Sequence, residues 1–261
     1  MPVIRKRIIG VITVKNGWAV QSIGYRRYLP LGRPEILAEN LDRWGADEIL
    51  LQCIDRSAHG LGPDLSLLDR VGRLGLSTPL IYAGGIRTAQ DAITVVATAA
   101  DRVLVDSMLW DDPDEIGRSG EYLGNQAIIA SLPLSIEGHE VRWLNYRTGI
   151  SAPFSDRLLK DLAAGTISEA LVIDWRHEGQ PLRFDAALLD ALPCDVPLIA
   201  FGGLSDAAQL SNILRSPRVA AVAIGNFLSY REHALQAFKQ NLVGLPIRPA
   251  TYQQSSDFCA P

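Results

Sequence analysis

Short runs rich in valine, isoleucine and leucine recur along the chain, and each is followed by a polar turn and a segment with helical spacing. This alternation is typical of a parallel sheet covered by helices. The runs predict eight strands, at residues 7–14, 48–53, 79–83, 102–106, 127–132, 170–174, 197–201 and 220–224. The segments between and after them predict helices at residues 34–44, 65–74, 89–99, 114–123, 155–164, 185–192, 206–214 and 231–242.

Eight strand and helix pairs predict an α/β protein of the closed (β/α)₈ type, the TIM barrel. A doubly wound open sheet is the alternative architecture. That fold usually has fewer strands and carries a G-x-G-x-x-G turn after the first one, whereas the first strand here ends in Val14-Lys15-Asn16-Gly17.

An internal repeat supports the barrel and divides it into two half-barrels. The run Pro79-Leu80-Ile81-Tyr82-Ala83-Gly84-Gly85 matches Pro197-Leu198-Ile199-Ala200-Phe201-Gly202-Gly203, and further matches pair Glu48 with Glu169, Asp64 with Asp185 and Asp69 with Asp190. We expect one barrel over residues 1–245, with half-barrels at about 1–122 and 123–245. Residues 246–261 are expected to form a tail that is mobile or lies across a neighbour.

The composition narrows the classes of partner. Hydrophobic residues make up 48% of the chain, and 25 basic and 29 acidic side chains give a net charge of −4 without a basic stripe. We therefore expect no nucleic-acid partner, and since no apolar run approaches the roughly 18 residues of a membrane span, no membrane partner. The N-terminus lacks the pattern of a signal peptide, and Cys53, Cys194 and Cys259 form no C-x-x-C pair. A cytoplasmic protein with reduced thiols is predicted.

Glycine pairs follow the third and seventh predicted strands, at the end of the barrel where active sites lie. Small polar pairs follow the fourth and eighth strands, and their backbone N–H groups are suited to hold an anion. We predict one phosphate cradle in each half, hence a small-molecule ligand phosphorylated at both ends; the alternative is that the glycines only satisfy tight turns. The first cradle comprises Gly84, Gly85, Asp106 and Ser107, and the second comprises Gly202, Gly203, Gly225 and Asn226.

Several motifs resemble the cyclase subunit of imidazole glycerol phosphate synthase, which belongs to histidine biosynthesis. They are Arg7-Ile8-Ile9, Lys15-Asn16-Gly17, the GADEILL run at 45–51, the AGGIRT run at 83–88 and the PLIAFGG run at 197–203, and the resemblance extends to about Leu242. It implies a duplicated barrel that binds a ligand with two phosphates. It also implies a glutaminase partner, docked on the face formed by the strand N-termini, that supplies ammonia.

The resemblance fails at the two carboxylates that the cyclase reaction uses as general acid and base. Thr13 stands at the aspartate position of the first strand, and Pro133 stands at that of the fifth. Whether the chain is an enzyme therefore stays open, and its catalytic residues are unknown. The candidate substitutes near strand ends are Lys15, Asp55, Asp174 and Glu178.

A second set of family positions keeps its charges. The resemblance places Arg7, Glu48, Arg102 and Glu169 in a ring around the ammonia entrance at the strand N-termini. Paired charges can close a pore against water and open for a small neutral molecule, and buried charges must pair because an unpaired one is costly. The alternative is a salt-bridged plug that simply completes the barrel floor.

The sequence keeps the charges of the ammonia entrance and lacks the two catalytic acids. In this respect it resembles a diverged branch of the family whose members take part in bacterial surface-polysaccharide synthesis as subunits of a glutamine amidotransferase. The Lys15-Asn16-Gly17 turn, Ile54-Asp55, the loop at 60–63 and the stretch at 25–28 resemble that branch. Three functions stay open. They are an ammonia-accepting amidotransferase subunit, a cyclase (a lyase-type synthase) with substituted acids, and a non-catalytic ligand-binding scaffold.

From the remaining reactive side chains we expect neither a cofactor nor a metal site. His59, His139, His177 and His233 lack metal-ligand spacing. Cys53 lies at a strand end but has no histidine fixed nearby to activate it as a nucleophile. Four tryptophans follow strand ends or lie in loops and could stack on a ligand, although packing under loops is the commoner role: Trp18, Trp110, Trp143 and Trp175.

Overall fold

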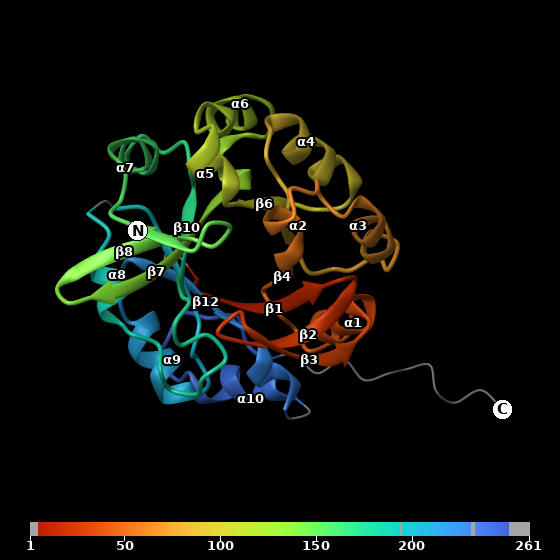
Figure 1. The fold of residues 1–261 in the computed structure, drawn as a ribbon. Helices are drawn as coiled ribbons and strands as arrows, with labels where there is room; N and C mark the ends of the chain where they lie inside the picture. The colour runs from red at the N-terminus through yellow and green to blue at the C-terminus, as the bar shows by residue number, and fades with distance from the viewer. Residues whose placement is uncertain (1–4, 194, 231–232, 251–261) are drawn as a thin grey trace.

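The computed structural model describes residues 5–193, 195–230 and 233–250 and shows a closed barrel of eight parallel strands (Figure 1). Neighbouring strands pair in chain order around the barrel, and the last pairs with the first, Arg7 opposite Ala221. The predicted (β/α)₈ fold is confirmed. The barrel strands are β1 (Arg7–Lys15), β4 (Glu48–Cys53), β5 (Leu80–Ala83), β6 (Arg102–Val105), β7 (Ile128–Glu137), β10 (Glu169–Asp174), β11 (Leu198–Phe201) and β12 (Val219–Ile224).

Helices lie outside the strands at each of the eight predicted places (Figure 1). The start of the predicted eighth helix, residues 231 and 232, lies outside the described residues. Asp64 caps the start of α3 by accepting from Leu67 N at 3.0 Å, whereas its sequence match Asp185 lies just before α8 and accepts from Ala187 N at 3.0 Å. The helices are α1 (Pro34–Arg43), α3 (Leu65–Gly72), α4 (Ala89–Thr98), α6 (Asp114–Leu123), α7 (Asp156–Ala163), α8 (Ala187–Asp190), α9 (Ala207–Leu214) and α10 (Ala234–Asn241).

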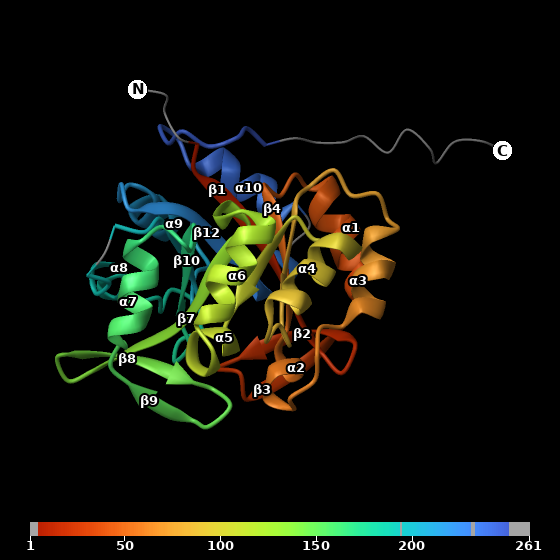
Figure 2. The same ribbon diagram turned by 90° about the horizontal axis from the view of Figure 1, so that it is seen from above.

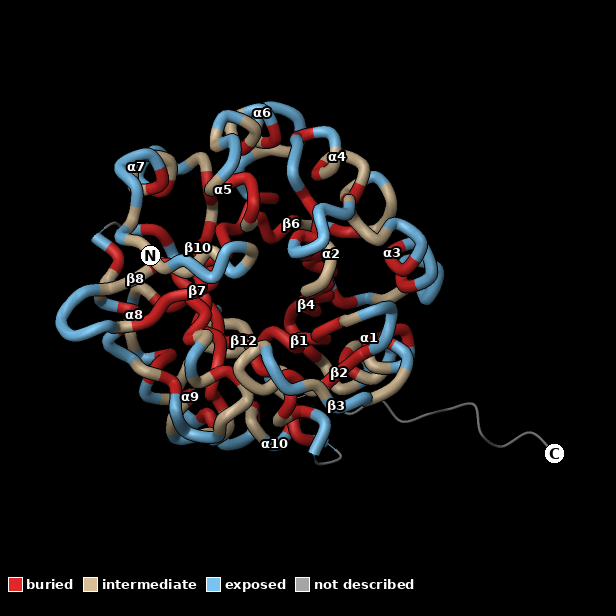
Figure 3. Tube along the Cα trace, in the orientation of Figure 1, coloured by how far each residue is buried: buried red, intermediate tan, exposed pale blue. Residues whose placement is uncertain are grey.

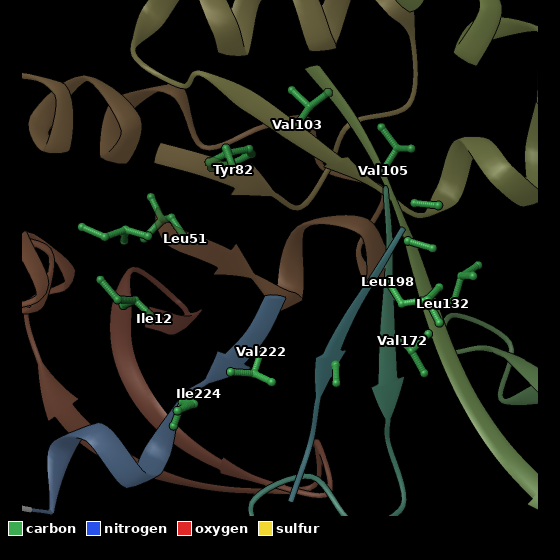
Figure 4. Packing of buried hydrophobic residues seen from close by; sticks show 14 of the residues in the cluster. Ile12, Leu51, Tyr82, Val103, Val105, Leu132, Val172, Leu198, Val222 and Ile224 are labelled. Atoms are coloured by element: carbon green, nitrogen blue, oxygen red, sulfur yellow. The ribbon is translucent and has the colours of Figure 1, made fainter. Parts of the chain in front are cut away.

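Two apolar layers hold the barrel together, one on each side of the strands. Because strand side chains alternate in direction, Ile9 and Val11 of β1 lie in the barrel interior while Ile8 and Ile12 pack outward against the helices. The burial pattern follows this arrangement, with buried strands inside and exposed outer helix surfaces (Figure 3). Outward-packed residues from all eight strands contribute to the larger layer, among them Leu51, Tyr82, Val105, Leu132, Val172 and Leu198 (Figure 4).

Two antiparallel hairpins extend the barrel at the strand C-termini and were not predicted. The first follows β1 and contains β2 (Trp18–Ile23) and β3 (Arg27–Gly32). The second continues from β7 through β8 (Glu140–Asn145) and β9 (Ile150–Ala152). Together with the short helices α2 (Ile54–Ala58) and α5 (Ser107–Asp111) they gather at one end of the molecule, here called the mouth (Figure 2).

The opposite end, here called the floor, holds the strand N-termini. Lys6 N donates to Pro246 O at 2.8 Å, so the beginning of the expected tail lies beside the start of β1. Residues 251–261 of that tail, as well as Cys194 and Cys259, lie outside the described residues. Among the described helices, none is both long enough and apolar enough to cross a bilayer.

Candidate functional site at the two ends of the barrel

Four charged side chains close the floor in a continuous ring of ion pairs. Arg7, Glu48, Arg102 and Glu169 are the first residues of β1, β4, β6 and β10, and each stands two positions before an inward apolar residue, so all four point inward. Arg7 Nη1 lies 3.0 Å from Glu48 Oε2, and Arg7 also pairs with Glu169. Arg102 Nη1 lies 3.2 Å from Glu48 Oε1 and 2.6 Å from Glu169 Oε2. Each arginine thus contacts both glutamates.

The ring is largely removed from water. Its side chains are between 8% and 22% exposed. Burial raises the pKa of Glu48 above its ordinary value, and the charges of Arg7 and Arg102 oppose that rise. Arg102 is further held by Ser168 Oγ at 2.9 Å and by the carbonyl oxygen of Gln126 at 3.1 Å. The ring separates the floor from the apolar interior that begins with Ile9.

A cavity of about 350 Å³ lies at the mouth. It is bounded by both hairpins and by the ends of several barrel strands, the position in which a TIM barrel holds its ligand. Its walls are mostly apolar and aromatic, and its charged lining residues are Arg26 and Asp106. Its other notable lining residues are Tyr25, Tyr28, Gln52, Cys53, Leu104, Ser131, Pro133, Tyr146, Ile173 and Trp175.

The two replaced acid positions face the interior. Thr13 shares the inward side of β1 with Ile9 and Val11 and is buried, and Pro133 lines the cavity. Pro133 stands between Ala130, the last residue of β7 paired with β6, and Leu134, the first paired with β8. A residue without an N–H is tolerated at such a change of partner. Neither position offers a group that titrates.

The four candidate catalytic side chains all have other partners and do not line the cavity. Lys15 Nζ lies 3.7 Å from the centre of the Tyr28 ring. Asp55 accepts from Asn16 N at 2.7 Å and so holds the turn after β1. The contacts of these two side chains are therefore with the β1 turn and the first hairpin.

The other two candidates are buried. Asp174 is 2% exposed and accepts from Asp185 N at 2.8 Å and from His177 N at 3.3 Å, and it also contacts His177 Nδ1 at 2.8 Å. Glu178 is 3% exposed and accepts from Ser22 Oγ at 3.0 Å and from Tyr25 N at 3.1 Å. Burial raises the pKa of Glu178 to about 7, opposed by these hydrogen bonds. Glu178 thus fastens the first hairpin to the loop after β10.

Both glycine pairs are required by the packing of loops. A Cβ at Gly84 would lie 2.2 Å from Cys53 O, and one at Gly202 would lie 2.6 Å from Asp174 O, the equivalent strand end in the other half. Gly85 and Gly203 also have positive φ angles, 73° and 77°. Tight turns therefore account for the glycines, and phosphate binding there remains a prediction.

The first predicted cradle contains a carboxylate that accepts hydrogen bonds from the donors around it. Asp106 accepts from Tyr146 OH and from Ser107 N, and its Oδ1 lies 3.3 Å from Ser57 Oγ. Gly85 N in turn donates to Ser57 Oγ at 2.9 Å. The donors expected for a phosphate are thus engaged within the protein.

The second predicted cradle surrounds a much smaller space of about 10 Å³, lined by Gly202, Gly203, Gly225, Asn226 and Glu178 among others. The Asn226 amide donates to Ser22 O at 2.6 Å and accepts from Ser22 N at 3.2 Å. This cradle is therefore covered by the first hairpin.

Some of the tryptophans pack against other side chains, whereas Trp175 and Cys53 line the cavity. Trp110 and Trp143 stack with ring centres 3.7 Å apart, whereas Trp175 lines the cavity and its Nε1 is buried without a hydrogen-bond partner in the described structure. Trp18 is 56% exposed. Burial raises the pKa of Cys53 to about 12, which keeps the thiol protonated and unreactive near neutral pH.

Sequence reasoning missed the partners that complete the mouth, namely Ser57, Tyr25 and Tyr146. Their contacts to Asp106 or Glu178 join segments 40 to 153 residues apart in the chain. The turn from β1 into β2 could have been found, because Asn16-Gly17 between β-prone runs is a signal for a two-residue hairpin turn. Lys15 and Trp18 are indeed paired across it.

Comparison with known proteins agrees with this architecture. Residues 7–234 match the family described as "Histidine biosynthesis protein". The chain is 27% identical over 240 residues to "Putative imidazole glycerol phosphate synthase subunit hisF2" of Vibrio vulnificus, covering 90% of this chain and 88% of the relative. It is 28% identical over 254 residues to "Imidazole glycerol phosphate synthase subunit HisF" of Dehalococcoides mccartyi, covering 94% and 98%. The chain is a cyclase-like member of the histidine biosynthesis protein family.

Proposed function

We propose that this chain is the ammonia-accepting subunit of a glutamine amidotransferase and that a glutaminase docks on its floor. The observation that carries the proposal is the ring of Arg7, Glu48, Arg102 and Glu169, in which every charge is paired with two others. A plug that only completes the floor could be made from apolar side chains at lower desolvation cost. A ring of paired charges is suited to a gate because its pairs can be exchanged one at a time.

The interior behind the ring supports passage of a small neutral molecule. Directly above the ring the inward side chains are apolar, among them Ile9, Leu50 and Leu171, and those of Ala221 and Ala223 are small. Polar inward side chains, Thr13, Gln52 and Ser131, follow nearer the mouth. An apolar interior favours neutral ammonia over the ammonium ion, since burying an unpaired charge costs several kcal/mol. Ammonia that crossed it would arrive at the mouth cavity, beside Ile173 and Leu104.

The mouth supports amidation of a ligand rather than the cyclase reaction. Thr13 and Pro133 supply no general acid or base, and Lys15, Asp55, Asp174 and Glu178 are not among the residues that line the cavity. We therefore propose a phosphorylated small-molecule acceptor, as in a system for bacterial surface-polysaccharide amidation. Both relatives are named as subunits of a synthase, which supports a partner protein.

Co-purification of the chain with a glutaminase from its host tests the proposal. We expect a complex that survives gel filtration, and an Arg102→Glu variant, which puts a third acid beside Glu48 and Glu169, should lose it. Asp69→Lys, which changes an exposed pair on α3, is the matched control and should leave the complex intact. Absence of any complex with the unaltered chain, or turnover of the cyclase's bisphosphate substrate with ammonium, would contradict the proposal.

A further inference from the structure

The two halves of the mouth differ in charge although the repeat gives them matching turns. Asp106 is the acidic side chain among the residues that line the mouth cavity, and Arg26 on the first hairpin is the basic one. Asp106 follows β6 directly and is only partly buried, so its carboxylate is open to the cavity. A ligand therefore meets a negative charge at the first predicted cradle.

The Asp106 carboxylate is held in place by donors from three segments. Its Oδ1 accepts from Ser107 N, from Ser107 Oγ at 3.0 Å and from Ser57 Oγ at 3.3 Å. Its Oδ2 accepts from Tyr146 OH on the second hairpin. Burial, together with the negative charge of Asp106, keeps the pKa of Tyr146 above its ordinary value, so the phenol remains a donor. Asp106 is thus a built-in anion that uses the donors a phosphate would need.

We propose that Asp106 determines ligand specificity at the mouth: it excludes phosphate from the first cradle and accepts a hydrogen bond from a hydroxyl or ammonium group of the ligand. Each carboxylate oxygen can accept more than one hydrogen bond, which leaves capacity for a ligand donor. A phosphate would meet like charge there, and the nearby Gly85 N–H is already given to Ser57.

The remaining cavity walls are consistent with a ligand of mixed polarity. Tyr25 and Trp175 offer aromatic faces, Gln52 offers an amide, and Arg26 offers a positive charge at the exposed rim. A ligand with one anionic end and one hydroxyl- or amine-bearing end fits these groups. This ligand deepens the proposed function and rests on it for the position of the ligand at the mouth. It carries one anionic end, where the sequence predicted a ligand with a phosphate at both ends.

Backbone amide resonances measured by NMR during titration test this inference. Inorganic phosphate and ethanolamine are the probes, and the reporters are the amides of Gly85 and Ser107. In the unaltered protein we expect ethanolamine, but not phosphate, to shift both resonances. In Asp106→Asn, which keeps the shape and removes the charge, we expect phosphate affinity to rise at least tenfold and ethanolamine affinity to fall by a similar factor.

Two further variants keep the result interpretable. Asp111→Asn removes an exposed carboxylate that pairs with Arg147 at 2.5 Å, and it should behave as the unaltered protein. Tyr146→Phe loosens the Asp106 carboxylate without removing its charge, and it should still exclude phosphate even if Asp106→Asn fails to fold. Phosphate binding at Gly85 and Ser107 of the unaltered protein, or no shift with either probe in any variant, would overturn the inference. Failure of the glutaminase to bind would leave these shifts unchanged, so the two proposals fail separately.

Discussion

Glu178 is a buried acid whose protonation is coupled to the stability of the fold. Its carboxylate receives hydrogen bonds from Ser22 Oγ and Tyr25 N, yet burial raises its pKa from an ordinary 4.5 to about 7. The folded chain therefore binds this proton more tightly than the unfolded chain does. Since the unfolded state binds fewer protons between these two values, the contribution of Glu178 to stability is complete below about pH 4.5 and is lost as the pH rises through 7.

Replacing Glu178 by Gln should remove this pH dependence. The separation of the two pKa values corresponds to about 3 kcal/mol, so the difference in unfolding free energy between the unaltered chain and Glu178→Gln should change by about that amount between pH 4.5 and 7.5. Urea denaturation at a series of pH values measures it. Glu121→Gln, at an exposed position, is the control, and parallel curves for all three proteins would refute the assignment.

Breaking the floor ring should destabilise the chain more than breaking an exposed pair. Glu169→Gln leaves Arg7 and Arg102 with one glutamate between them, and losing one partner of a largely buried pair costs about 3 kcal/mol. Asp69→Asn, whose pair with Arg73 is exposed, should cost no more than about 0.5 kcal/mol. Chemical denaturation at pH 7 compares the two, and equal costs would show that the ring is not a tight network.

At the residue scale the sequence predicted the side chains whose direction follows from strand periodicity. Each ring residue stands two positions before an inward apolar residue of its strand, so its inward direction could be expected. The surroundings of Asp106 could not, because Ser57 and Tyr146 lie 49 and 40 residues away and reach it through loops. No local pattern encodes such contacts.

At the scale of elements, the first hairpin covers the mouth and is fastened by few contacts. Ser22, at the end of β2, exchanges two hydrogen bonds with Asn226 and donates a third to Glu178. Gly24 N also donates to Glu178 O at 2.9 Å. Tyr25 N donates to the Glu178 carboxylate as well, and β2 pairs with β1. Among the described strands β3 pairs only with β2, so this outer strand is an edge that can open while the barrel stays closed.

Asn226→Ala should loosen the first hairpin selectively. It removes both bonds to Ser22 and leaves buried backbone groups unpaired, which costs about 1–3 kcal/mol. Hydrogen–deuterium exchange should accelerate at least fivefold in residues 18–32 and stay unchanged in β5 and β6. Asn125→Ala, which removes a single exposed contact to Gly165, is the control. Uniform acceleration over the barrel would contradict a locally fastened hairpin.

The eight barrel strands and their helices were predictable because each carries a periodic pattern of apolar residues. A single (β/α)₈ barrel buries the apolar positions of all of them. The two hairpins were not recognised, since their strands are short and mixed in burial, as in β3 with no buried residue. The second hairpin turns at Gly138-His139 between Glu137 and Glu140, a polar stretch that also fits a loop. The hairpin strands therefore decide the shape of the mouth, although their apolar patterns predict strands less clearly than those of the barrel do.

At the scale of the whole molecule, a ring of ion pairs and a cavity lie at opposite ends of the barrel interior. The floor carries four paired charges, whereas Thr13 and Pro133 occupy the two acid positions at the mouth. This combination is the basis of the proposal that the chain receives ammonia and delivers it to an acceptor other than the cyclase substrate. The partner should therefore respond to the floor of this chain.

Glutamine hydrolysis by the partner glutaminase, measured with and without this chain, tests the central claim most directly. We expect the chain to raise the hydrolysis rate at least tenfold, because docking on the ring should organise the partner's active site, and we expect Arg102→Glu to abolish the increase while Asp69→Lys preserves it. An unchanged rate with the unaltered chain, or equal activation by the Arg102→Glu variant, would contradict the claim.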